Sequence, residues 1–197
     1  MAIPKILIIP GSLRSGSSNV RLAALAAKEM ALAEAEVTRI SLEDYRLPLF
    51  DGDYAADDAI PAAAVQLKRM VEAHHGIFIC CPEYTASVPP LIKNAIDWVT
   101  RIRDRGEAAN AMFKGRVFAI GSVSRAAHGG IRGLMALRQI LELGCGALVI
   151  PEQIAVARAE QAFDERDNLK DEAAAAALKA MARRLVELAG LMSGMDR

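Results

Sequence analysis

The beginning of the chain alternates between two hydrophobic periods. Residues 5–9 form a continuous apolar run that ends in a Pro-Gly-Ser turn, which is typical of a strand buried on both faces. In the next stretch Leu22, Ala26 and Met30 recur at helical spacing, and residues 36–41 return to strand-like alternation. The pattern therefore predicts a strand, a helix and a second strand.

The same alternation continues to the far end of the chain. It predicts further strands over residues 76–81, 116–121 and 147–150, and further helices over residues 62–73, 91–100, 131–143 and 168–189. Strands that alternate with helices favour a parallel sheet, because parallel neighbours are joined by helical crossovers. We expect one α/β domain over residues 1–197, with a doubly wound, five-stranded parallel sheet in the order 2-1-3-4-5.

Composition and charge exclude several classes of protein. The chain has 197 residues, of which 53% are hydrophobic, and 24 basic side chains balance 24 acidic ones. A chain without net charge has no broad field to attract nucleic acid or an anionic membrane. No apolar run approaches the roughly 20 residues that cross a bilayer, and no secretory signal opens the sequence. We therefore expect a cytoplasmic protein with no nucleic-acid or membrane partner.

Cysteine and histidine usage gives no metal or disulfide framework. Cys80, Cys81 and Cys145 have neither an even number nor a zinc-binding spacing, and we interpret them as reduced structural thiols. The three histidines form no metal-binding pattern, and His128, which lies beside glycines in a loop, is more typical of a loop residue than of a proton donor. The sequence singles out no catalytic side chain and no metal ligand.

Three loops carry the candidate chemistry. In a doubly wound sheet of this strand order, ligands bind beyond the carboxyl ends of the strands, between the first and third strands. The loop over residues 10–19 holds two glycines, four serines, Arg14 and Asn19 before a helix, which suits a phosphate monoester. Ser17 stands where a P-loop requires lysine, which disfavours a nucleoside triphosphatase. Ordinary helix capping is the alternative interpretation of these serines.

The loops after the third and fourth strands complete the set. Residues 81–90 include three prolines, and such a stiff loop suits a flat ligand such as a flavin, which Glu83 or Thr85 could orient. The alternative is a rigid connection into the next helix, and we expect Trp98 of that helix to belong to the core. Residues 121–133 again gather glycines, serines and a basic residue, more polarity than a simple turn needs.

Residues 11–19, 82–98, 129–132 and 137–141 together resemble the NAD(P)H-dependent FMN reductase family, a flavodoxin-like group that includes bacterial quinone and chromate reductases. The resemblance implies non-covalently bound FMN and transient NADPH or NADH. The resemblance implies that the phosphate is held by Ser12, Arg14, Ser17, Ser18 and Asn19. The flavin ring would contact Pro82, Glu83, Tyr84 and Thr85, and the loop from Ser122 to Gly129 would close its other side. Two residues depart from the family pattern, which usually has asparagine at Thr85 and glycine at Pro90. Proline at position 90 suits the first turn of the helix that follows.

The implied activity is hydride transfer from NAD(P)H through FMN to a small-molecule acceptor, such as a quinone, a free flavin, an azo dye or chromate. Members of the family commonly form dimers or tetramers, and the helix over residues 91–101 would contribute to that contact. Two alternatives are a flavodoxin-type electron carrier, which usually has a strongly acidic face, and a phosphate-ligand module without redox function. The neutral charge disfavours the first alternative, and the motif over residues 82–98 disfavours the second.

Overall fold

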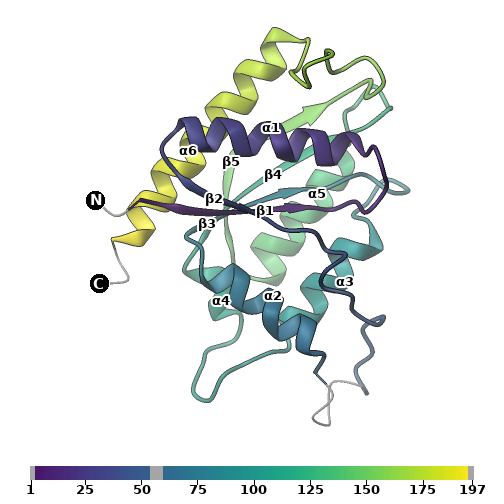
Figure 1. Ribbon diagram of the computed structural model, residues 1–197. Helices are drawn as coiled ribbons and strands as arrows, with labels where there is room; N and C mark the ends of the chain where they lie inside the picture. Colours follow the sequence, from purple (N-terminus) through teal and green to yellow (C-terminus); the bar gives the residue numbers. More distant parts are fainter. Residues whose placement is uncertain (1–2, 54–59, 195–197) are drawn as a thin grey trace.

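A single five-stranded sheet forms the centre of the molecule. The computed structural model describes residues 3–53 and 60–194. All neighbouring strands are parallel, and their order is β2-β1-β3-β4-β5, which confirms the predicted flavodoxin-like α/β fold. The strands are β1 (Lys5–Pro10), β2 (Glu36–Arg39), β3 (Gly76–Cys80), β4 (Val117–Val123) and β5 (Leu148–Val156) (Figure 1).

Helices cover both faces of this sheet, and each face has its own core. The first core joins Ile6 and Ile8 of β1 to α1 (Ser18–Leu32) and α6 (Glu172–Ser193). The second core joins Leu7 and Ile9 of the same strand to the remaining helices: α2 (Ala62–Glu72), α3 (Pro90–Val99), α4 (Ala111–Lys114) and α5 (Ile131–Gln139) (Figure 1). Successive residues of a strand point to opposite faces, so the continuous apolar runs supply both cores.

Helix boundaries follow local sequence signals. Pro90 is the first residue of α3, where its fixed φ and missing N–H cost nothing, as the sequence predicts. Asp171 caps α6, since its carboxylate accepts a hydrogen bond from the backbone N–H of Ala174 at 2.9 Å. The structure also adds what the pattern missed, namely the four-residue α4 and a π-helical turn (Ile140–Gly144) directly after α5.

Two strands are longer than the sequence predicts. β5 was expected to end at Ile150 but continues to Val156, because a register shift against β4 between Phe118 and Ile120 accommodates Pro151. β4 was expected to end at Gly121 but continues to Val123, so Ser122 belongs to the strand rather than to the loop after it.

Trp98 is a core residue, as expected from the sequence. Its side chain is fully buried, and its indole N–H donates to the backbone carbonyl of Pro48 at 2.7 Å. Asn94, one turn earlier in α3, also donates to that carbonyl at 2.9 Å, and its own carbonyl accepts from the N–H of Phe50 at 2.7 Å. Helix α3 therefore fixes the segment that follows β2.

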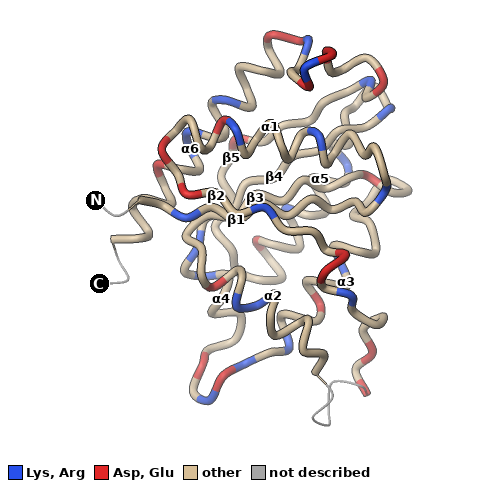
Figure 2. Tube along the Cα trace, in the orientation of Figure 1, with Lys and Arg blue, Asp and Glu red and all other residues tan. Residues whose placement is uncertain are grey.

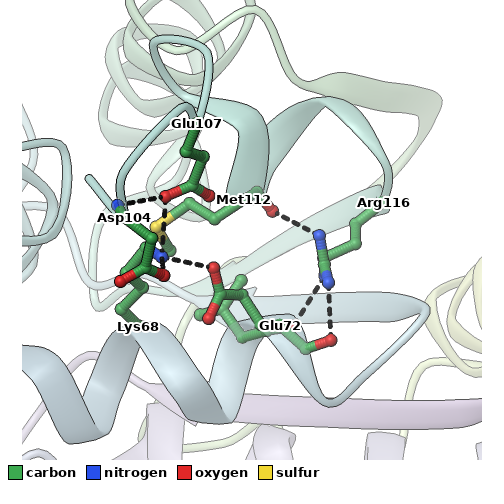
Figure 3. A network of polar contacts seen from close by, with 7 residues as sticks. Lys68, Glu72, Asp104, Glu107, Met112 and Arg116 are labelled. Atoms are coloured by element: carbon green, nitrogen blue, oxygen red, sulfur yellow. Dashed lines mark hydrogen bonds and ion pairs between the residues drawn. The ribbon is translucent and has the colours of Figure 1, made fainter. Parts of the chain in front are cut away.

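A buried lysine holds the connection between α3 and α4 against α2. The ammonium of Lys68 lies 2.6 Å from Glu72, 3.0 Å from Asp104 and 3.0 Å from Glu107 (Figure 3). Burial alone would lower the pKa of Lys68, but its hydrogen bonds to the three carboxylates raise the pKa overall. Arg116 extends the contact by donating to the backbone carbonyls of Val71, Glu72 and Met112.

Charged residues of both signs are spread over helices and loops, as Figure 2 shows, in keeping with the balanced composition. Among the described residues, no helix combines the length and the apolar character that crossing a membrane requires.

We expect Lys68→Met to lower the free energy of unfolding by about 2–3 kcal/mol, because it removes the cation that three carboxylates share. This loss is smaller than the roughly 3–5 kcal/mol of a fully buried ion pair, because Asp104 is largely solvated. Urea unfolding monitored by circular dichroism would measure it. Arg184→Ala, which breaks an exposed pair with Glu187, is the control and should cost less than about 1 kcal/mol. Equal losses in the two variants would contradict this account of the Lys68 cluster.

Candidate functional site

The loop between β1 and α1 passes close to the neighbouring strand. The backbone N–H of Gly11 donates to the carbonyl of Cys80 at 2.8 Å, next to Ile92 of α3. A Cβ atom at Gly11 would lie 2.8 Å from Cγ1 of Ile92 and 3.0 Å from the Cys80 carbonyl oxygen, so a larger residue would push the loop away. Glycine at this position brings the first loop beside the end of β3.

The same loop presents unused hydrogen-bond donors at the start of α1. Ser17 precedes the helix, but its hydroxyl does not cap it, and the N–H groups of Ser18 and Asn19 have no preceding helical turn to donate to. Gly16 has a φ of 66° with open space beside it. Arg14 is exposed and has no acidic partner among the residues that the structure describes. This donor set, at the positive end of a helix dipole, suits a phosphate.

The side chain of Asn19 is hydrogen-bonded to the end of β4. Its Nδ2 donates to the carbonyl of Val123 at 2.9 Å, and its Oδ1 accepts from the N–H of Val123 at 2.9 Å. This pair of bonds ties the start of α1 to the carboxyl end of β4. Both polar atoms of the Asn19 carboxamide are therefore already used within the protein.

Glu83, in the loop after β3, turns its carboxylate toward the start of α5. The side chain is only 5% exposed and forms an ion pair with Arg132. It also accepts from the backbone N–H groups of Arg132 at 3.0 Å and Gly133 at 3.2 Å. Burial alone would raise the pKa of Glu83, but its hydrogen bonds and the charge of Arg132 lower the pKa overall. The carboxylate thus caps α5 from a different loop.

The next residues form a strained two-residue turn. Tyr84 and Ser87 exchange backbone hydrogen bonds of 3.0 Å in both directions, and the residues between them have positive φ, 48° at Thr85 and 62° at Ala86. Such turns favour Asn-Gly, because asparagine and glycine tolerate this conformation and a β-branched threonine does not. The asparagine that is usual in the family suits this position, and Thr85 holds the same turn at a higher conformational cost.

Glycines also pack the loop after β4 against its neighbours. Gly129 and Gly130 have φ values of 63° and 86°. A Cβ atom at Gly129 would lie 2.7 Å from the backbone of Ala155, and one at Gly130 would overlap the hydroxyl of Ser122. That hydroxyl is fully buried and has no hydrogen-bond partner within the described part of the chain. The Ser122 side chain therefore packs under Gly130.

A cavity of about 540 Å³ lies where these loops meet, within the size range of small-molecule sites. Most of the residues predicted for FMN line it: Ser12, Arg14, Ser17, Ser18, Asn19, Pro82, Glu83 and Tyr84. Thr85, Ser122 and Gly129 do not line it. Thr85 is at the outer turn, Ser122 is inside the sheet, and Gly129 is packed on β5.

Sequence reasoning missed one wall of this cavity. Ala159 and Glu160 follow β5, which was expected to end nine residues before Ala159, so their loop was not considered. Arg125 pairs with Glu160 at 3.2 Å on this wall. Arg21 of α1 also lines the cavity, and Asp167 holds its guanidinium 4.4 Å above the ring of Phe163. Only the extent of β5 would have pointed to Ala159 and Glu160.

The donor set fits FMN, and the thiols nearby do not suggest covalent chemistry. The hydroxyls, the helix N-terminus and Arg14 suit a phosphate at one end, and Pro82 and Tyr84 supply a flatter, less polar wall. Burial raises the pKa of the Cys80 thiol, and it raises that of Cys81 to about 12. Both thiols therefore stay protonated near neutral pH and are poor nucleophiles.

We expect Glu83→Gln to lower the free energy of unfolding by about 1–3 kcal/mol at pH 7, since a charged acceptor of several hydrogen bonds is lost. Because the folded-state pKa of Glu83 lies below its unfolded value, this contribution is present above about pH 4.3 and disappears as the pH falls through the folded-state pKa. Urea unfolding at pH 7 and at about pH 3 would test this. Glu43→Gln, at an exposed pair, is the control. A difference between wild type and Glu83→Gln that is as large at low pH would contradict the assignment.

We expect Ala86→Gly to raise the free energy of unfolding by about 0.5–1 kcal/mol, because relief of the positive φ exceeds the entropy that glycine loses on folding. Ala177→Gly, inside α6, has the opposite expected sign, a loss of about 0.5–1 kcal/mol. Thermal unfolding of both variants would measure the pair. Destabilisation by both substitutions would show that the turn is not strained.

Known proteins are similar to this chain in sequence and in fold. The family model described as NADPH-dependent FMN reductase matches residues 4–161. A quinone reductase of Escherichia coli (strain K12) is 36% identical over 138 residues, 70% of this chain and 69% of the relative. An NAD(P)H-dependent FMN reductase of Pseudomonas aeruginosa is 33% identical over 172 residues, 86% of each chain. The structure of FerB, a flavoenzyme NAD(P)H:(acceptor) oxidoreductase from Paracoccus denitrificans, is 26% identical with a TM-score of 0.77, covering 96% of this chain and 99% of that one. The chain therefore belongs to the NADPH-dependent FMN reductase family of oxidoreductases, as its three loop motifs predict.

Proposed function

We propose that this chain binds FMN in the cavity between the loops after β1, β3 and β4 and reduces a quinone-class acceptor with NAD(P)H. The observation that carries the proposal is that the anion-binding loop (Ser12 to Asn19) and the rigid loop at Pro82 line the same cavity. An anion site alone could bind many ligands, and a proline-rich wall alone does not identify a ligand. Their combination matches a molecule with a phosphate at one end and a flat ring at the other.

The phosphate end is held by the hydroxyls of Ser12, Ser17 and Ser18, by the N–H groups at the start of α1 and by Arg14. The fixed dipole of α1 and the guanidinium of Arg14 offset the phosphate charge. Arg21 is held by Asp167, so Arg14 is the cation of this wall that is free to approach the phosphate. Bound FMN would supply the two-electron chemistry, accepting a hydride from NAD(P)H and passing it to the acceptor.

At the ring end the chain orients the flavin and limits its exposure to water. Pro82 is buried and rigid, whereas Tyr84 is 52% exposed at the mouth of the cavity. An open mouth suits an exchange in which NAD(P)H leaves and an acceptor takes its place. Acceptors of the quinone class are favoured by the relatives, since a 2-hydroxy-1,4-benzoquinone reductase of a Burkholderia species is 33% identical over 140 residues.

We further propose a cytoplasmic homo-oligomer. A groove of about 580 Å³ runs between α3 and the π-helical turn after α5, and Leu143 on its rim is 81% exposed. A second copy would cover this apolar side chain together with the outer face of α3. Sedimentation analysis of the purified protein tests the proposal, and a monomer at micromolar concentration would contradict it.

The activity is tested by the visible absorption spectrum of the purified protein, supplemented with FMN if it is colourless. We expect flavin bands that bleach on anaerobic addition of NADPH and return when a quinone is added. Bands that persist with NADPH would instead identify an electron carrier. A protein that retains no flavin would refute FMN binding.

We expect Arg14→Ala to weaken FMN binding by roughly 1.5–3 kcal/mol, because it removes the charged donor of the first loop. Arg184→Ala is the matched control, since Arg184 lies on α6 near Pro4 at the amino end of β1 and should leave the affinity unchanged. Quenching of FMN fluorescence on titration would give both dissociation constants. An affinity of Arg14→Ala equal to that of the control would refute the phosphate assignment.

A further inference from the structure

Glu83 joins two loops that are far apart in the sequence. It lies in the loop after β3, and the groups that it binds, the N–H groups of Arg132 and Gly133 and the guanidinium of Arg132, belong to the start of α5. The fit between the two segments leaves no spare room. A Cβ atom at Gly133 would lie 3.2 Å from the Cα of Glu83 and 3.2 Å from the carbonyl oxygen of Ser87.

The loop that Glu83 holds is under conformational strain. Thr85 and Ala86 follow directly, both with positive φ. A non-glycine residue keeps such a conformation only where the surroundings determine it. On one side the mutual hydrogen bonds of Tyr84 and Ser87 close the turn, and on the other side the carboxylate of Glu83 fixes its base.

Electrostatics also argue against direct contact between Glu83 and a flavin. Reduction adds negative charge to a flavin, so a carboxylate beside the ring would oppose it. Here the charge of Glu83 is directed to the positive end of α5 and is paired with Arg132. The Glu83 carboxylate thus lies near the cavity wall, but the positive charge of Arg132 offsets its negative charge there.

We infer that Glu83 and Arg132 form a clamp that positions the backbone of residues 82–87 along the flavin-binding wall, and that neither side chain is itself a ligand of the cofactor. This inference rests on the proposed function for its kinetic consequence. The clamp itself is present in the protein without FMN, so it can be tested separately from the kinetic consequence.

Three variants remove decreasing parts of the contact between Glu83 and the start of α5. Glu83→Ala removes every bond, Glu83→Gln keeps one neutral acceptor, and Arg132→Ala leaves both backbone N–H groups bound to the carboxylate. Glu43→Gln, at the exposed pair with Arg46, is the matched control. The measurements are amide hydrogen exchange of the protein without FMN, the FMN dissociation constant, and the rate of flavin reduction by saturating NADPH in the fully loaded protein.

In Glu83→Ala we expect exchange at the Arg132 and Gly133 amides to accelerate by about tenfold or more, because their acceptor is gone. The reduction rate should fall by about tenfold, while the FMN dissociation constant changes less than about threefold, since the phosphate end is intact. Glu83→Gln should be intermediate and Arg132→Ala mildest.

Unchanged exchange in Glu83→Ala would overturn the clamp itself. A slower reduction rate without faster exchange would make Glu83 a direct contact of the flavin, and faster exchange with an unchanged rate would make it a helix cap only; either result overturns the positioning role. If Glu83→Ala does not fold, Glu83→Gln and Arg132→Ala decide by the same criteria. Failure of the wild-type protein to bind or reduce FMN would refute the proposed function, and the exchange measurement would still decide the clamp.

Discussion

Burial of the sheet on both faces is the constraint on which the rest of the structure depends. Alternate residues of β1 enter two separate cores, so the strand has no side left for polar chemistry. All strands are parallel, and their carboxyl ends therefore meet at one edge. The polar residues that the strands exclude gather in the loops at that edge, and the cavity lies there.

Polar side chains then fix these loops to one another. Asn19 binds both backbone groups of Val123, and Glu83 binds two backbone N–H groups at the start of α5. A short polar side chain at such a site satisfies backbone groups that the end of a strand or helix leaves free. Asn19 and Glu83 look like cofactor-binding residues in the sequence, but their side chains instead fix the backbone of the segments around the cavity.

The sequence predicts the fold well because hydrophobic period is a direct consequence of burial. Every strand and long helix was expected close to its observed place, and Pro90 begins α3 as predicted. The errors in strand length arise where pairing between strands overrules the local pattern. The last strand was expected over residues 147–150, but a register shift lets β5 continue past Pro151, and β4 continues beside it through Ser122. The cavity wall at Glu160 was missed for the same reason.

The buried thiols have a consequence for chemical durability. Quinones are electrophiles that alkylate thiolates, and a protein that handles them is exposed to this damage at every turnover. Cys80, Cys81 and Cys145 are all at most 2% exposed, and burial raises the pKa of each, to about 12 for Cys81 and about 11 for Cys145. At neutral pH these thiols therefore stay protonated, and the thiol form is the poorer nucleophile. The packing that completes the two cores thus also makes the protein resistant to arylation by the acceptors that we propose for it.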